Sequence, residues 1–90
     1  MSVKININPF LSHLINDQKV VEVNGNTVGQ CLQQLVTRFP ELKNSLFEKD
    51  GKLNRAVDIY VNLESSYPEG LAKPVRDGDE LYTVVILSGG

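Results

Sequence analysis

One amphipathic helix, expected over residues 28–39, separates two groups of strand-like segments in this chain. Its apolar residues share one face at helical spacing: Val28, Cys31, Leu32, Leu35, Val36 and Phe39. Thr27 and Gln30 have the spacing of a capping box, so the helix is predicted to begin there. Pro40 ends it, because a proline pushes the preceding residue out of the helical region. The 90 residues make one small domain, in which this helix is expected to cover one face of a sheet.

Strand-like segments lie on both sides of the helix. Alternating polar and apolar residues predict strands over residues 3–8, 19–24 and 56–62. Residues 80–87 predict a last strand with two largely apolar faces. Such a strand is typically central in its sheet and often parallel to a neighbour.

The connecting segments carry weaker signals. Residues 9–18 are expected to form a loop whose apolar side chains fold back on the core or contact a partner: Phe10, Leu11, Leu14 and Ile15. Residues 42–47 suggest a short helical turn. Residues 63–75 are rich in Ser, Pro and Gly, which predicts mostly loop with a short edge strand near residues 71–75.

This order of elements predicts an α+β fold with the β-grasp, or ubiquitin-like, architecture. The first and last strands lie side by side in a mixed sheet of four to five strands, and one main helix packs on one face. The other face then exposes an apolar patch, which comprises Tyr60, Tyr82, Val84 and Ile86. We expect this patch to be a partner-binding surface; the alternative is a cover formed by loop residues or by a second copy.

Charge and composition exclude several kinds of partner. The formal net charge is -2 and the two signs are mixed, so no basic stripe indicates nucleic acid binding. The first residues contain no continuous apolar stretch, so we expect no membrane partner and a cytoplasmic location. Cys31 is the one cysteine, and its place on the apolar helix face predicts a role in the core.

Two further groups are better explained by structure than by chemistry. His13 has no second ligand-type residue at metal-binding spacing, so an exposed position is expected. Asp77, Asp79 and Glu80 surround Gly78 in a tight-turn sequence. A single turn offers a hard cation too few oxygen ligands, and we therefore predict no metal site.

The chain ends on Gly89 and Gly90, directly after the last predicted strand. Glycine lacks a Cβ atom and lets the backbone approach another surface closely. Two terminal glycines arise by chance in about one chain in two hundred, so this ending alone does not decide the function. The alternative to a functional ending is a frayed terminus. We expect a domain over residues 1–87 and a flexible tail over residues 88–90 that is thin enough to enter a partner's active site.

Three motifs in this order resemble the MoaD/ThiS family of ubiquitin-like sulfur carriers, and the likeness covers nearly the whole chain. They are the stretch GKLNRAVDIYVN at residues 51–62, the turn DGDE at residues 77–80 and the terminal diglycine. Residues 52–62 and 70–72 look most like the carrier of the thiocarboxylate route to cysteine. Ser88 stands where the family commonly has alanine.

The resemblance implies that the chain is a carrier and not an enzyme. An E1-like activating enzyme would use ATP to adenylate the Gly90 carboxylate, and sulfide or a persulfide would displace AMP to leave a thiocarboxylate. An unperturbed α-carboxyl group has a pKa of about 3.3 to 3.7, so it is ionised at neutral pH and able to attack. Ser88 and Gly89 would be the spacer, because three extended residues reach about 10 Å. No cofactor is expected to bind the carrier itself.

The resemblance leaves the fate of the sulfur open. The cysteine branch implies a PLP-dependent cysteine synthase as the acceptor. One alternative is that the chain is the small subunit of molybdopterin synthase and delivers sulfur with the large subunit. A second is a ubiquitin-like modifier that is joined through Gly90 to lysines of other proteins. A third is a β-grasp binding module whose terminus is incidental.

Overall fold

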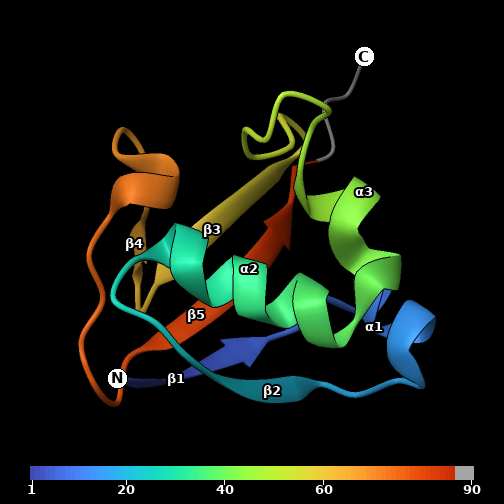
Figure 1. The fold of residues 1–90 in the computed structure, drawn as a ribbon, viewed down its shortest axis with the longest axis horizontal. Helices are drawn as coiled ribbons and strands as arrows, with labels where there is room; N and C mark the ends of the chain where they lie inside the picture. Colours follow the sequence, from blue (N-terminus) through green and yellow to red (C-terminus); the bar gives the residue numbers. More distant parts are fainter. Residues whose placement is uncertain (87–90) are drawn as a thin grey trace.

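The computed structural model describes residues 1–86, and Figure 1 shows one sheet with a helix lying across it. Within these residues, five strands pair in the order β2-β1-β5-β3-β4. Their bounds are β1 Ser2–Asn6, β2 Val20–Asn24, β3 Val57–Val61, β4 Glu64–Ser65 and β5 Glu80–Val85. β1 and β5 run parallel, and the other neighbours are antiparallel. The predicted β-grasp arrangement, with the first and last strands side by side, is confirmed.

The two-residue period of the strands decides which side chains enter the core. Val3 and Ile5 of β1 are fully buried, as is Leu81 of β5. Ile5 lies opposite Leu81 in the parallel register, so the two central strands bury side chains at the same level. Their polar neighbours in the sequence face the opposite side of the sheet, because successive residues of a strand alternate between faces.

The helix α2, Val28–Arg38, covers the inner face of the sheet (Figure 1). Its buried side chains are Val28, Cys31, Leu32, Leu35 and Val36. Thr27 caps the helix, since its Oγ1 accepts a hydrogen bond from the Gln30 N–H at 3.1 Å. In the predicted capping box, the Gln30 side chain would accept a hydrogen bond from the Thr27 N–H. Its Oε1 instead accepts from the Asn26 N–H, one residue earlier. Phe39 follows as the C-cap and packs against the edge of the core.

Two short helical segments then close one end of the core. They are a 3-10 turn, η2 Pro40–Leu42, and α3, Lys43–Leu46. Leu42 and Leu46 are fully buried, and Phe47 is nearly so. The short helical turn predicted for residues 42–47 is therefore confirmed and begins slightly earlier than expected.

The prediction of a loop over residues 9–18 is wrong in part. This segment contains α1, Pro9–Ser12, and a 3-10 turn, η1 His13–Ile15. Asn8 explains the helix, because its side-chain oxygen accepts from the Phe10 N–H at 2.9 Å and Pro9 suits a first helical position. Leu11 and Ile15 fold back on the core as expected, whereas Phe10 and Leu14 are exposed.

The edge strand predicted near residues 71–75 is also wrong. The chain forms a 3-10 turn there, η3 Gly70–Ala72, and the edge strand is β4. Leu71 of this turn packs against Gly29 of α2, where an added Cβ would lie 3.0 Å from the Leu71 carbonyl oxygen. This close approach and an isolated antiparallel bridge between Pro74 and Thr27 position the segment beside the start of α2.

Replacement of Thr27 by alanine is expected to lower the free energy of unfolding by about 1 kcal/mol, because the Gln30 N–H loses its acceptor. Thr37→Ala is a matched control in the same helix. The exposed Thr37 hydroxyl donates to the Gln33 carbonyl, and alanine has the higher helix propensity, so the change stays within about 0.5 kcal/mol. Urea unfolding followed by circular dichroism measures both variants, and equal losses would contradict the capping role.

Candidate functional site

The open face of the sheet carries apolar side chains near its centre. Tyr60 of β3 lies opposite Tyr82 of β5, on the face away from α2. Tyr82 is 36% exposed and Ile86 is 50% exposed, while Tyr60 and Val84 are half-buried. The structure therefore brings together the four residues predicted from the sequence. Tyr60, Tyr82, Val84 and Ile86 are called the apolar patch below.

Residues of β1 and β2 border the apolar patch. Asn6 lies beside Tyr82, and its Nδ2 donates to Glu80 Oε1 at 3.3 Å and to the Leu81 carbonyl at 3.1 Å. Val20 of β2 lies opposite Asn6 and is 49% exposed. It extends the accessible apolar surface toward the sheet edge. The sequence-based patch left Val20 out, because its place beside Asn6 depends on the pairing of β2 with β1.

The end of β5 is tied to the loop before β3. The Ile86 N–H donates to the Ala56 carbonyl at 2.7 Å, one step beyond the pairing of Val57 with Val85. Leu87 and the predicted tail, Ser88, Gly89 and Gly90, lie outside the described residues. The structure therefore fixes Ile86, the last described residue, which is called the root of the tail below because the predicted tail follows it in the sequence.

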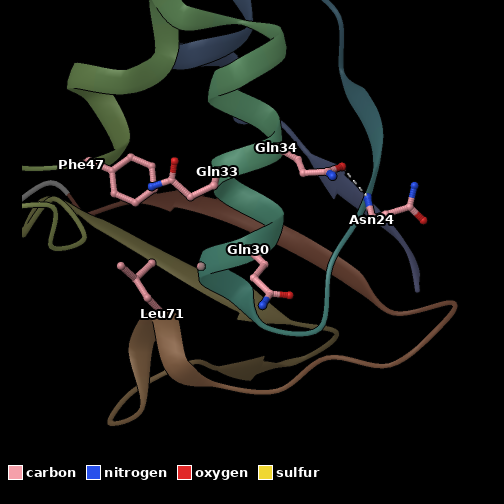
Figure 2. A pocket seen from close by; sticks show the side chains of 7 residues that line it. Asn24, Gln30, Gln33, Gln34, Phe47 and Leu71 are labelled. Atoms are coloured by element: carbon pink, nitrogen blue, oxygen red, sulfur yellow. Dashed lines mark hydrogen bonds between the residues drawn. The ribbon is translucent and has the colours of Figure 1, made fainter.

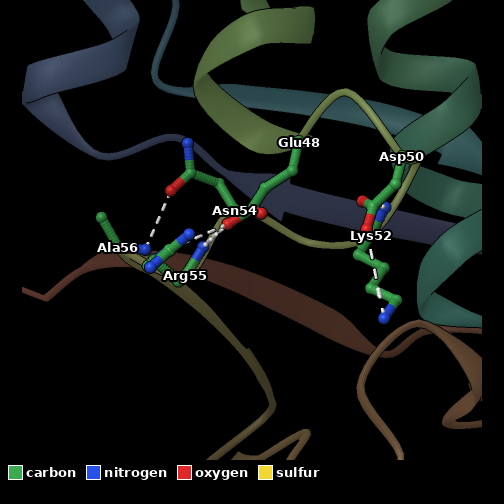
Figure 3. A network of polar contacts seen from close by, with 6 residues as sticks. All are labelled: Glu48, Asp50, Lys52, Asn54, Arg55 and Ala56. Atoms are coloured by element: carbon green, nitrogen blue, oxygen red, sulfur yellow. Dashed lines mark hydrogen bonds and ion pairs between the residues drawn. The ribbon is translucent and has the colours of Figure 1, made fainter.

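Side-chain hydrogen bonds fix the loop that holds this root (Figure 3). Glu48 Oε2 accepts from the backbone N–H of Arg55 at 3.0 Å and from its Nε at 3.4 Å. Asn54 Oδ1 accepts from the Ala56 N–H at 2.8 Å. This loop contains the first part of the stretch that resembles the MoaD/ThiS family. Its polar residues therefore hold the backbone to which Ile86 is bonded.

A groove of about 360 Å³ opens beside Ile86. Its apolar lining includes Leu53, Val57, Tyr67 and Pro68. Asp58 steadies one wall, because its carboxylate accepts from the hydroxyls of Ser65 at 2.7 Å and Ser66 at 3.3 Å. This groove continues the accessible apolar surface from the apolar patch to the root of the tail. The role of Asp58 depends on the path of the chain after β3, and the strand pattern carries no signal for it.

A second groove, of about 440 Å³, lies beside α2 on the helix side of the sheet (Figure 2). It is lined by Asn24, Gly29, Gln30, Gln33, Gln34, Phe47 and Leu71. Gln34 Oε1 accepts from the Asn24 N–H at 3.0 Å, so one amide serves to hold β2 against the helix. The lining offers amides and apolar atoms, which neither ionise nor act as nucleophiles. We assign no chemistry to this groove.

Cys31 occupies the core, as predicted. Its side chain is fully buried, and this burial raises the pKa of the thiol, with a smaller opposing effect of the N-terminal positive charge. A buried thiol of raised pKa is a poor nucleophile, because the reactive form is the thiolate. His13, the other isolated candidate, lies exposed in η1.

The acidic turn before β5 is structural, as predicted. Asp77 Oδ1 accepts from the Ser2 N–H at 2.7 Å, and Asp79 Oδ2 accepts from the Arg76 N–H at 2.9 Å. Gly78 supplies the positive φ of 88° that the turn requires. Within residues 1–86, no group of three or more His, Cys, Asp or Glu side chains is placed to hold a metal ion. Over the same residues, every helix is too short or too polar to cross a membrane.

The combination of this fold with these motifs recurs in known proteins. Residues 5–90 match the ThiS family. The chain belongs to the ThiS family. The match covers nearly all of the sequence, including the loop that holds the root of the tail, β5 and the terminal glycines.

Known proteins similar to this chain align with it over nearly its whole length. Sulfur carrier protein CysO of Mycobacterium tuberculosis is 32% identical, and the match covers 100% of both chains. A chain in the crystal structure of the Amycolatopsis orientalis BexX/CysO complex is 31% identical over 98% of this chain and 99% of that one, with a TM-score of 0.86. SAMP1 from Haloferax volcanii is 28% identical over 100% of both chains, with a TM-score of 0.87. The chain is thus a CysO-like member of a ubiquitin-like sulfur carrier family.

Alkylation of Cys31 by iodoacetamide is expected to be slow in the folded protein, because burial and the raised pKa both reduce accessible thiolate. We expect a rate about a hundredfold below that of the urea-unfolded protein, which corresponds to an opening free energy of about 3 kcal/mol. At constant stability the alkylation rate should rise with pH, because the thiolate is the reactive form and burial raises the pKa of the Cys31 thiol above its ordinary value. Mass spectrometry of timed samples measures the modification, and similar rates in the two states would contradict a core role.

Proposed function

We propose that this chain is a sulfur carrier whose Gly90 carboxylate is converted to a thiocarboxylate. The observation that carries the proposal is membership of the ThiS family over residues 5–90. The exposed apolar patch beside the root of the tail supports it, since an activating enzyme needs a surface to hold while the tail enters its active site.

The carboxylate gains its reactivity from a partner enzyme. In the first proposed step, an oxygen of the Gly90 carboxylate attacks the α-phosphorus of ATP, and pyrophosphate leaves. In the second step, a sulfide nucleophile attacks the acyl carbon of the adenylate, and AMP leaves with the electrons of the broken bond. The thiocarboxylate remains on the carrier. ATP is therefore a substrate of the E1-like activating enzyme, and no cofactor role is proposed for the carrier.

The residues of this chain contribute position rather than catalysis. The bond from Ile86 to Ala56 fixes the point at which the tail leaves the sheet. Cys31 is the one cysteine of the chain, and its burial prevents it from carrying sulfur at the surface. Adenylation and sulfur transfer then depend on catalytic groups of partner proteins.

Cysteine synthesis is the proposed destination of the sulfur. The resemblance of residues 52–62 and 70–72 to the cysteine branch supports this route, as does the similarity to CysO. A PLP-dependent synthase would present an activated serine derivative, whose activating group leaves as the thiocarboxylate sulfur bonds to the side-chain carbon. Hydrolysis of the resulting bond between the Gly90 acyl group and cysteine would release cysteine and restore the carboxylate. The large subunit of molybdopterin synthase is the alternative acceptor.

A second candidate function is protein modification through Gly90. The similarity to SAMP1, a small archaeal modifier protein, favours it. The same adenylate would then be attacked by a lysine amine of another protein, with formation of an isopeptide bond and release of AMP. The two functions share the activation step and differ in the nucleophile that follows.

Incubation of the chain with its cognate activating enzyme, ATP and sulfide is expected to exchange one oxygen for sulfur. Intact-mass spectrometry detects this change, and tandem spectra place it on Gly90. Deletion of Gly89 and Gly90 should abolish the exchange, whereas Cys31→Ala should leave it intact because the thiol takes no part. If neither an adenylate nor a thiocarboxylate forms with the authentic enzyme, the proposal is wrong.

The product then distinguishes the possible acceptors. Thiocarboxylated carrier mixed with a PLP-dependent synthase and an activated serine derivative should yield a carrier–cysteine adduct at Gly90, and hydrolysis of its acyl bond should release cysteine. Sulfur transfer to a molybdopterin precursor alone would redirect the assignment. Gly90-dependent conjugates to lysines in cell extracts, without a thiocarboxylate, would favour the modifier.

Ile86→Asp is expected to raise the KM of the activating enzyme for the carrier by about tenfold or more, because a charge would be placed in an apolar contact. The kcat should change little, since Ile86 does not touch the reacting atoms. Leu63→Asp is the matched control, because Leu63 is 90% exposed in the turn between β3 and β4, away from the root of the tail. ATP–pyrophosphate exchange measures both constants, and equal effects of the two variants would argue against the apolar patch as the contact.

A further inference from the structure

Charge is unevenly distributed between the two ends of β5. Residues 43–55 contain four cations and two anions, although the whole chain has a net charge of -2. Four carboxylates gather with Ser2 and Lys4 at the start of β5: Glu22, Asp77, Asp79 and Glu80. β5 has six residues, so its two ends lie about 17 Å apart at about 3.3 Å per residue. The protein is therefore negative at the start of β5 and positive beside the root of the tail.

A groove of about 890 Å³ at the positive end is lined by three of these cationic side chains. Its charged lining residues are Lys43, Glu48, Lys49, Asp50 and Arg55. Arg55 directly precedes Ala56, whose carbonyl holds Ile86, so this groove and the apolar patch meet at the root of the tail. Arg55 also borders the smaller groove beside Ile86. Lys43, Lys49 and Arg55 are called the basic rim below.

The fold makes little use of the charge of the basic rim. Arg55 lies 3.4 Å from Glu48, yet its side chain is 90% exposed. Lys43 and Lys49 are exposed, and neither takes part in a salt bridge among residues 1–86. Exposed ion pairs contribute about 0 to 1 kcal/mol, so stability gives little reason for this concentration of cations.

We propose that the basic rim docks on acidic side chains that border the entrance to the adenylation site of the activating enzyme. This inference rests on the proposed function, because the partner is the enzyme that adenylates Gly90. Complementary charges steer encounter and fix orientation more than they add affinity. The same acidic surface repels the carboxylates at the start of β5, so the carrier approaches with its tail end first.

The length of the tail favours a protein surface over a nucleotide as the partner of the basic rim. Four extended residues beyond Ile86 span at most about 14 Å. When Gly90 meets ATP at the far end of that span, the basic rim lies at the entrance and away from the phosphates. Nucleic acid fits less well, because Glu48 and Asp50 interrupt the cations and a phosphate backbone favours a continuous positive track.

The double variant Lys43→Glu/Lys49→Glu tests the proposal. Its matched control, Lys19→Glu/Arg76→Glu, reverses two exposed cations outside the basic rim and changes the net charge equally. Binding of each chain to the activating enzyme without ATP is measured by calorimetry at about 0.05 M and about 0.5 M NaCl. We expect the Kd of the basic-rim variant to rise about tenfold to a hundredfold at low salt, with a smaller difference at high salt. The control should stay within about threefold, because only the distant field changes.

Carbodiimide crosslinking gives an independent readout, since it joins lysine amines directly to carboxylates. Crosslinks from Lys43 or Lys49 to an Asp or Glu of the enzyme are expected. Equal binding by the two double variants, or crosslinks confined to other lysines, would overturn the proposal.

ATP–pyrophosphate exchange by the unmodified chain separates this inference from the proposed function. Binding without exchange would contradict the sulfur-carrier function, and the binding of the two double variants would then decide the docking proposal by itself. Exchange with equal binding of the variants would remove the basic rim alone. An unmodified chain that neither binds nor exchanges would overturn both.

Discussion

The parallel pairing of β1 with β5 is the contact on which the other elements depend. It joins residues 4–6 to residues 80–82, so the two centre strands of the sheet cannot pair before nearly the whole chain is present. Parallel neighbours require a crossover, and α2 provides one whose apolar face covers the sheet it crosses. Thr83 strengthens the pairing, because its hydroxyl accepts from the Asn8 N–H and donates to the Asn6 carbonyl. Since this pairing fixes β5, it also fixes the position of Ile86, the last described residue before the predicted tail.

Elements with a strong local signal were predictable from the sequence, whereas those that depend on a single cap or on a distant contact were not. α2 has a continuous apolar face, a capping threonine and a terminating proline, and it begins at the expected residue. The short helix α1 depends on a single cap from Asn8, which an apolar count over residues 9–18 does not reveal. The turn at Leu71 depends on its fit against Gly29, and no pattern within residues 63–75 contains that contact.

The residues of the candidate site also fall into two groups, those with a local sequence signal and those that depend on distant contacts. Alternation along β3 was enough to predict that Tyr60 faces outward, and the β-grasp arrangement placed Tyr82 of the largely apolar β5 on the same face. Val20 joins this surface only because β2 lies beside β1, a fact of strand order rather than of local pattern. The hydrogen bonds of Glu48 with Arg55 and of Ala56 with Ile86 depend on the path of the loop before β3. The sequence motif at residues 51–62 showed that this loop resembles the family, and the structure shows that its hydrogen bonds hold Ile86 in place.

Coverage of the sheet from one side leaves accessible apolar surface for a partner to bury. α2 buries its apolar residues on the inner face, and in the described part of the chain the outer face keeps Tyr82 and Ile86 accessible to water. Burial of apolar surface contributes about 25 cal/mol per Å², so a partner that covers the apolar patch recovers free energy the monomer cannot. The docking role proposed for the basic rim concerns a different quantity, because charge steering changes the rate and orientation of encounter while apolar contacts mainly set the rate of release. Under the proposed function, the chain moves between an activating enzyme and an acceptor, which requires rapid, oriented binding without slow release. A small apolar patch beside a basic rim satisfies both requirements.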